Sequence, residues 1–166
     1  MSESATHLDD GPIVVGIEPG LPSRIIETAE RTAGSMGCEV IFAYVELNSA
    51  LVELEYTEPR TRDSLDPAID EEMSAVASTI KGMLGSALAE SRVQWSFRVL
   101  AGDPASALSR LAADVHSRML VVGTRRHGGL HRVEEFFTGS LAKALAMGQD
   151  RPVLLVPLNR ETPPAE

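Results

Sequence analysis

Basic side chains gather in one loop near the C-terminal end of the chain. The stretch 125–132 contains no acid, although the whole chain has a formal net charge of −9, and it holds Arg125, Arg126, His127, His131 and Arg132. Gly139 and Ser140 follow at the predicted start of a helix, where free backbone N–H groups and the helix dipole favour an anion. The pattern predicts an anion-binding site. A solvated basic loop followed by an ordinary serine cap is the alternative.

The elements on either side of this loop place it at the edge of a sheet. An apolar run at 119–122 precedes the loop and breaks at Gly123-Thr124, and a helical pattern at 139–147 leads to a last strand at 153–156. Strand, loop, helix and strand form a βαβ unit, the connection that parallel strands require. Open α/β sheets bind nucleotides between the C-terminal end of a strand and the N-terminus of a helix. The loop therefore stands where nucleotide phosphates would bind.

Strands and helices alternate along the whole chain. Apolar runs predict strands at 13–17, 39–45, 119–122 and 153–156, and strict alternation over 93–99 predicts a strand at a sheet edge. Helical spacing predicts helices at 24–36, with Ser23 as a candidate N-cap, and at 70–88, 104–115 and 139–147, the third of them with Asp103 as N-cap and Pro104 in its first position. This order predicts an α/β fold, a five-stranded parallel sheet covered by helices on both faces.

One acidic stretch fits no element. Residues 46–67 contain Pro59 and Pro67 and show no sustained period, so we expect a long loop, with a helical turn possible at 49–54. Loops of this length in compact domains are usually functional or mobile. The stretch 46–70 could cover a binding crevice as a lid or be a solvated loop, and the sequence leaves both open.

Length and composition bound the class of protein. The chain has 166 residues, of which 43% are hydrophobic and 23% charged, as in an ordinary globular domain. We expect one domain over 11–158 between disordered tails at 1–10 and 159–166. A pI near 4.9 argues against nucleic acid as a partner, and no secretion signal or membrane span is recognisable. The single cysteine, Cys38, is expected to be buried and inert, which suits a cytoplasmic protein.

Other chemistry in the same region is poorly supported. His127 and His131 have the i, i+4 spacing of helical metal ligands, but the glycines between them disfavour a helix. Ser140 lacks the Gly-x-Ser-x-Gly context of a nucleophile elbow. Glu134-Glu135, just before a helix, are more simply partners of its dipole. The sequence therefore predicts neither a metal site nor a catalytic residue.

Three passages resemble the universal stress protein family. They are IVVGIEPGLPSRIIETAERTA, VLAGDPASALSRLAADVHSRMLVVGT and TGSLAKALAMGQDRPVLLVP, and the likeness extends over about 12–158. The resemblance implies strand order 3-2-1-4-5, a Rossmann-like fold of the adenine-nucleotide alpha-hydrolase-like kind, and a nucleotide crevice between strands 1 and 4. It also implies a homodimer in which the last strands, 153–156, pair antiparallel. An apolar strand at an open sheet edge is itself prone to such pairing.

Carried over position by position, the resemblance implies a set of nucleotide-binding residues. They are Glu18, Val45, Val122, Gly123, Arg126, Gly139, Ser140 and Leu141. In ATP-binding members the strand-4 loop reads Gly-x2-Gly-x9-Gly-Ser/Thr. Here Arg126 replaces the second glycine, and twelve residues rather than nine separate it from Gly139, whereas Gly129 restores the nine-residue interval but loses the first one. An arginine cannot provide a close backbone approach, but it could bring a guanidinium to phosphate.

The function expected from these residues is nucleotide sensing. The ligand would be ATP or AMP, with Mg²⁺ only if ATP is bound, and the homodimer would act in the stress response without strong catalysis. The alternative is a dimeric scaffold that has lost the nucleotide and acts through protein contacts. A slow nucleotide hydrolase is the weakest reading, because the sequence places no general base.

Overall fold

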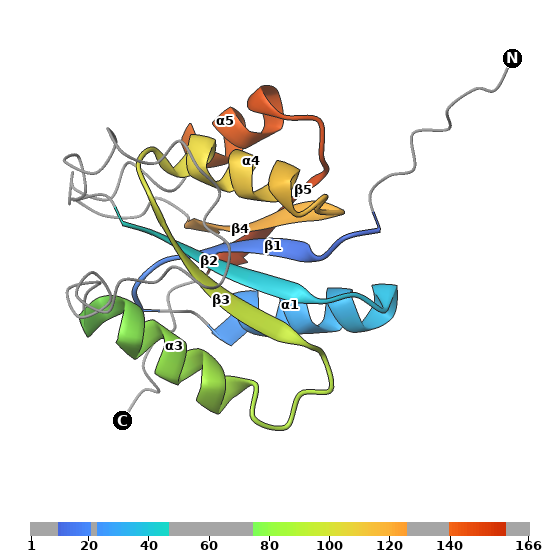
Figure 1. Ribbon diagram of the computed structural model, residues 1–166, viewed down its shortest axis with the longest axis vertical. Helices are drawn as coiled ribbons and strands as arrows, with labels where there is room; N and C mark the ends of the chain where they lie inside the picture. The colour runs from blue at the N-terminus through green and yellow to red at the C-terminus, as the bar shows by residue number, and fades with distance from the viewer. Residues whose placement is uncertain (1–9, 21–22, 47–74, 126–139, 159–166) are drawn as a thin grey trace, which may run out of the picture.

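A five-stranded parallel sheet forms the centre of the molecule (Figure 1). The computed structural model describes residues 10–20, 23–46, 75–125 and 140–158. The sheet runs in the order β3-β2-β1-β4-β5, with β1 Ile13–Ile17, β2 Val40–Glu46, β3 Trp95–Ala101, β4 Met119–Arg125 and β5 Val153–Leu158. The predicted α/β class and strand order 3-2-1-4-5 are confirmed.

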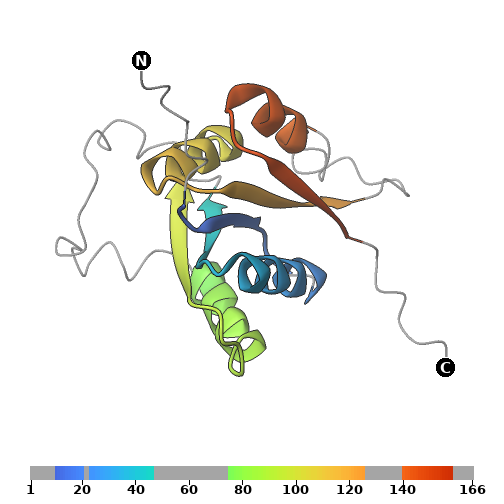
Figure 2. The same cartoon turned by 90° about the vertical axis from the view of Figure 1, so that its right-hand side faces the viewer.

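Two layers of helices cover the sheet. α1 (Ser23–Met36) and α3 (Ala75–Ala87) pack on one face, and α4 (Pro104–Asp114) and α5 (Ser140–Gly148) pack on the other (Figures 1 and 2). The chain therefore passes to the second face after β3. β2 and β3 are added on one side of β1, whereas β4 and β5 are added on the other side. The strand order therefore reverses between β1 and β4.

The core follows the two-residue period of the strands. In β1, Ile13 and Val15 are buried beneath α1 and α3, whereas Val14 is buried beneath α4 and α5. All three are completely buried because the central strand has helices on both faces. Phe42 of β2 meets the half-buried Trp95 of β3 edge to face, with ring centroids 6.3 Å apart, and Trp95 packs against the core on the α1 side.

Local sequence signals define the ends of two helices. Gly37 has a φ of 62°, its N–H donates to the carbonyl of Gly34, and the N–H of Cys38 donates to the carbonyl of Ala33. These two bonds form a Schellman motif, which favours glycine because only glycine takes a positive φ without steric cost. At α4, the carboxylate of Asp103 accepts the N–H of Ser106, so the predicted N-cap is confirmed.

The last two strands are longer than the apolar runs that predicted them. β4 does not break at Gly123-Thr124 but continues to Arg125, because β5 runs beside it to Leu158. The N–H of Leu120 donates to the carbonyl of Pro152. In a regular parallel ladder that starts from this bond, only every second residue of β5 directs its backbone nitrogen toward β4, and the nitrogen of Pro157 points away from it. A proline there removes no hydrogen bond from the sheet.

The remaining strands fit the predicted patterns with small shifts. β3 starts and ends two residues later than the predicted 93–99 and is an edge strand with exposed Ser96 and Arg98, as its alternation indicated. The predicted acidic loop from residue 47 on, the first five residues of the helix predicted at 70–88, and the tails predicted at 1–10 and 159–166, except Asp10, lie outside the described residues.

Candidate functional site

The C-terminal ends of β1, β2 and β4 meet at a pocket. It lies at the point where strand order reverses, between β1 and β4, and encloses about 460 Å³ of empty space, counting the part open to solvent. Open parallel sheets bind ligands at this position because the two connections leave it on opposite faces, which keeps the strand ends accessible. The fold alone therefore selects this edge of the sheet as the candidate site.

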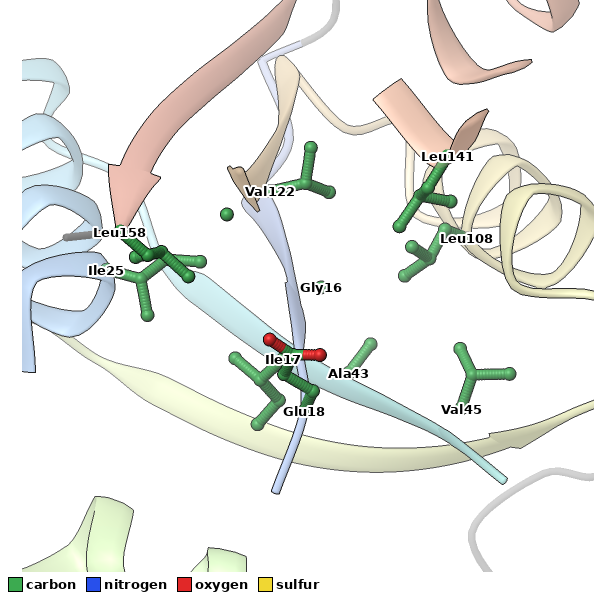
Figure 3. A pocket seen from close by; sticks show the side chains of 11 residues that line it. Gly16, Ile17, Glu18, Ile25, Ala43, Val45, Leu108, Val122, Leu141 and Leu158 are labelled. Atoms are coloured by element: carbon green, nitrogen blue, oxygen red, sulfur yellow. The ribbon is translucent and has the colours of Figure 1, made fainter. Parts of the chain in front are cut away.

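Two apolar walls enclose the pocket, one from each face of the sheet (Figure 3). On the α1 side the wall consists of Ile17, Ile25 and Leu158. On the opposite side it is built from β2, β4, α4 and α5 by Ala43, Val45, Leu108, Val122 and Leu141. Such walls suit a flat apolar group such as a nucleobase.

One carboxylate stands between the walls. Glu18 directly follows β1 and is half-buried, and it is the one charged side chain among the described residues that line the pocket. Figure 3 shows its carboxylate between the two sets of apolar side chains. An ionised carboxylate only accepts hydrogen bonds, so it fits ligand hydroxyl or amino groups rather than an anion.

Two glycines line the pocket, and neighbouring side chains fill the space where their Cβ atoms would be. A Cβ added to Gly16 would lie 3.0 Å from Cδ1 of Leu108 and 3.2 Å from Cγ1 of Val122. A Cβ added to Gly123 would overlap Cδ1 of Leu158. Both glycines therefore let neighbouring leucines lie against the backbone, which brings the helix and the edge strand close to the pocket.

Five of the predicted binding residues line the pocket together. They are Glu18, Val45, Val122, Gly123 and Leu141. Ser140 is the first residue of α5 and adjoins Leu141, although its side chain lies outside the described part of the chain. Arg126 and Gly139 lie wholly outside it, as do His127, His131, Glu134, Glu135, Phe136 and Phe137. The interpretation of the basic loop as an anion site therefore stays a prediction.

Sequence reasoning missed six lining residues. They are Gly16, Ile17, Ile25, Ala43, Leu108 and Leu158. Ile25 and Leu108 belong to the apolar stripes of α1 and α4, which predicted burial but not which end of the sheet each residue faces. Gly16, in an otherwise β-branched strand, was the one local signal, because a glycine inside a strand often marks close approach of another group.

The α4 side of the pocket depends on a well-formed helix start. The Asp103 carboxylate accepts the N–H of Ser106 at 2.9 Å and its hydroxyl at 2.8 Å. The two hydrogen bonds from Ser106, the backbone one first, lower the pKa of Asp103 below its ordinary value. Pro104 at the start of the helix adds a fixed φ, and Leu108 follows one turn later in the pocket wall.

Cys38 lies at the opposite end of β2 and is half-buried rather than buried as expected. It precedes β2, in the turn after Gly37, where only part of the side chain packs on the core. Desolvation is the largest influence and raises the pKa of the thiol, while Arg118 partly opposes it. A raised pKa leaves less of the reactive thiolate, in agreement with the predicted inert thiol.

No group of three or more His, Cys, Asp or Glu side chains that could hold a metal ion occurs within 10–20, 23–46, 75–125 and 140–158. Of the helices in these same ranges, none is long and apolar enough to cross a membrane.

Comparison with known proteins identifies the family. The sequence profile of the Universal stress protein family matches residues 11–157, whereas no curated protein sequence matches significantly. Universal stress protein UspA from Lactobacillus plantarum superposes with a TM-score of 0.61 at 16% identity, covering 89% of this chain and 98% of that one.

Two further similar structures contain nucleotides. The universal stress protein from Archaeoglobus fulgidus in complex with dAMP has a TM-score of 0.57 and 17% identity, covering 88% of this chain and 97% of that one. A universal stress protein in complex with cAMP has a TM-score of 0.52 and 21% identity, covering 88% and 96%. These likenesses support the fold, and the profile match over nearly the whole chain shows the family. The chain belongs to the universal stress protein family.

Proposed function

We propose that this chain binds an adenine nucleotide, ATP or AMP, in the pocket at the C-terminal ends of β1, β2 and β4. The observation that carries the proposal is the meeting of Glu18, Val45, Val122, Gly123 and Leu141 around one pocket at the strand reversal point. Structural neighbours in complex with dAMP and cAMP support the same ligand class.

The pocket suggests how each part of the ligand would bind. The adenine ring would pack against Ala43 and Val45, and the ribose hydroxyls would donate to the Glu18 carboxylate, as acidic residues do in other dinucleotide-binding sheets. The phosphates would extend from Gly123 toward the first turn of α5, whose free N–H groups and dipole favour an anion. Arg126 and Gly139 would complete the phosphate site, with Mg²⁺ present only if ATP is bound.

Binding would serve regulation rather than catalysis. Nucleotide occupancy would change the surface around the pocket that a partner protein meets in a stress response. We further propose that the protein works in the cytoplasm, since a lone cysteine suits a reducing compartment.

We also propose a homodimer joined through β5. β5 is an edge strand with outward backbone groups, and Leu155, in its middle, is 46% exposed. An apolar strand of this kind is stabilised by pairing with a second copy.

Calorimetric titration with AMP and with ATP tests the nucleotide proposal. We expect saturable binding to the natural protein and at least about a tenfold loss of affinity in Glu18→Ala, the loss of roughly one charge-assisted hydrogen bond. The matched control is Glu27→Ala, which removes an exposed glutamate of α1 that does not line the pocket. Absence of binding heat, or equal loss in both variants, would contradict the proposal.

The second candidate is a dimeric scaffold that binds no nucleotide. Arg126 in place of the family's second glycine, with its altered spacing to Gly139, favours it. Purifying the protein and analysing the released small molecules separates the two candidates: a co-eluting adenine nucleotide supports the first, and a ligand-free dimer that fails to bind added nucleotide supports the second.

A further inference from the structure

One residue of the α1-side wall, Leu158, comes from the edge strand β5, which is not a neighbour of β1. β1 pairs with β4 only as far as Gly16 and Val122, whereas β5 continues beside β4 until Leu158 lies opposite Arg125. Leu158, the last residue of β5, therefore lies beside the pocket at a level that β1 does not reach. Leu158 is 7% exposed and packs with Ile25 in the same core cluster.

Gly123 lies directly against this leucine. Val121 faces α1 and is fully buried, so the missing side chain of Gly123, two residues later, faces the same side. A Cβ at Gly123 would overlap Cδ1 of Leu158 and lie 3.0 Å from its Cγ, and the three nearest atoms all belong to Leu158. The space that the glycine leaves is thus filled by Leu158.

A glycine beside a bound nucleotide can have two different purposes. It can let the ligand approach the backbone, or it can let another side chain lie across the backbone. The contacts around Gly123 favour the second purpose, because the direction in which a Cβ would project is occupied by protein.

We propose that Gly123 makes room for Leu158, and that Leu158 is the positioning residue that sets the α1-side wall of the nucleotide pocket. The role of Leu158 in the nucleotide pocket rests on the proposed nucleotide-binding function, whereas the contact between Gly123 and Leu158 concerns packing alone. A larger residue at 123 would push the end of the leucine side chain out of place and thereby alter the pocket without touching the ligand.

A double-mutant cycle tests this inference, with Gly123→Ala, Leu158→Ala and the double variant compared in both melting temperature and AMP affinity. We expect Gly123→Ala alone to lower the melting temperature by several degrees, as overpacking does, and to weaken AMP binding about tenfold. In the Leu158→Ala background the same change should cost less than about 1 °C and less than about twofold in affinity, because the obstructing atoms are gone. Leu158→Met, which nearly conserves volume, should retain AMP affinity within about threefold.

Val40→Ala provides the matched control. Val40 is buried in the same cluster but lies two strands from β4, level with Met119 rather than Gly123, and does not line the pocket, so its substitution should combine additively with Gly123→Ala. Equal loss of AMP affinity from Gly123→Ala with Leu158 present or truncated would show direct ligand contact and overturn the inference.

The two proposals fail in different ways. If the natural protein binds no nucleotide, the nucleotide proposal fails, and the melting temperatures still decide the packing. Additive melting temperatures for Gly123→Ala and Leu158→Ala would then overturn the inference, and strong coupling would support it.

Discussion

Asp103 illustrates how a single side chain links the start of a helix to the pocket wall. Its carboxylate holds the first turn of α4, from which Leu108 reaches the pocket one turn later. The hydrogen bonds from Ser106 hold the pKa of Asp103 below its ordinary value. A carboxylate with a lowered pKa stabilises the fold above the pKa of the unfolded chain, and that contribution is lost as pH falls through the folded pKa.

Asp103→Ala should therefore lower the free energy of unfolding by about 1 kcal/mol at neutral pH. The difference from the natural protein should shrink as pH falls below about 4, where the aspartate becomes protonated. Urea denaturation at several pH values measures both effects.

Asp103→Asn is the control for this prediction. An asparagine keeps an oxygen acceptor for the N–H of Ser106 but has no charge to lose, so it should show a smaller stability loss at neutral pH than the alanine variant. A stability difference between Asp103→Ala and the natural protein that is the same at pH 3 and pH 7 would contradict the prediction.

At the scale of elements, backbone conformation decides what each glycine contributes. Gly37 has a φ of 62° in the Schellman motif that ends α1. Gly82, by contrast, lies inside the exposed face of α3 with nothing near the position of a Cβ and with no positive φ. The same substitution should thus have opposite effects at the two positions.

Gly37→Ala should destabilise the protein by about 1 kcal/mol, because a Cβ is costly in the left-handed region. Gly82→Ala should stabilise it by about 0.5 to 1 kcal/mol, because alanine has the higher helix propensity. For a chain of this length each kcal/mol corresponds to roughly 2 to 4 °C in melting temperature, which calorimetry resolves. Melting temperatures that shift in the same direction in both variants would contradict the different roles given to Gly37 and Gly82.

At the scale of the whole molecule, the two edges of the sheet differ. β3 exposes Ser96 and Arg98, whereas β5 exposes Leu155 and Pro157 and is apolar throughout. Polar and charged residues protect a sheet edge from pairing, and apolar ones leave it open to a second chain. The asymmetry supports self-association through β5 rather than through β3.

Leu155→Lys should shift the protein toward the monomer, because a charge on each copy would be buried at the paired edge. Light scattering after size-exclusion chromatography measures the mass, which we expect to be twice the chain mass for the natural protein. Val76→Lys, which replaces an exposed valine of α3, serves as the control and should leave the mass unchanged. A monomeric natural protein, or a Leu155→Lys variant that stays dimeric, would contradict the proposed interface.

The order and kind of the elements could be predicted from the sequence because they depend on local signals. β-branched runs, helical stripes and the Asp103-Pro104 cap correctly indicated the strands and helices of the described residues. Local apolarity failed at the ends of β4 and β5, since Gly123 and Pro157 interrupt it. β4 and β5 nevertheless remain paired up to Arg125 and Leu158, because each strand is held by the other, which is distant in sequence.

The candidate site could be predicted only in part. The residues carried over from the family resemblance included five that line the pocket, all of them at strand ends or at the start of α5. Ile25 and Leu158 were not found, because nothing in their own surroundings in the sequence distinguishes them from other core residues.

The sequence by itself determined the alternation of strands and helices, because each element depends on residues close together in the chain, and it determined the family, because the family's motifs follow one another along nearly the whole chain. Only the tertiary structure decided that β5 pairs with β4 beyond the point where β1 ends. This pairing places Leu158 against Gly123, opposite the pocket wall that contains Val45 and Leu108. The physical reason is that a pocket is formed by elements distant in sequence, and their meeting depends on sheet order and register rather than on any local pattern.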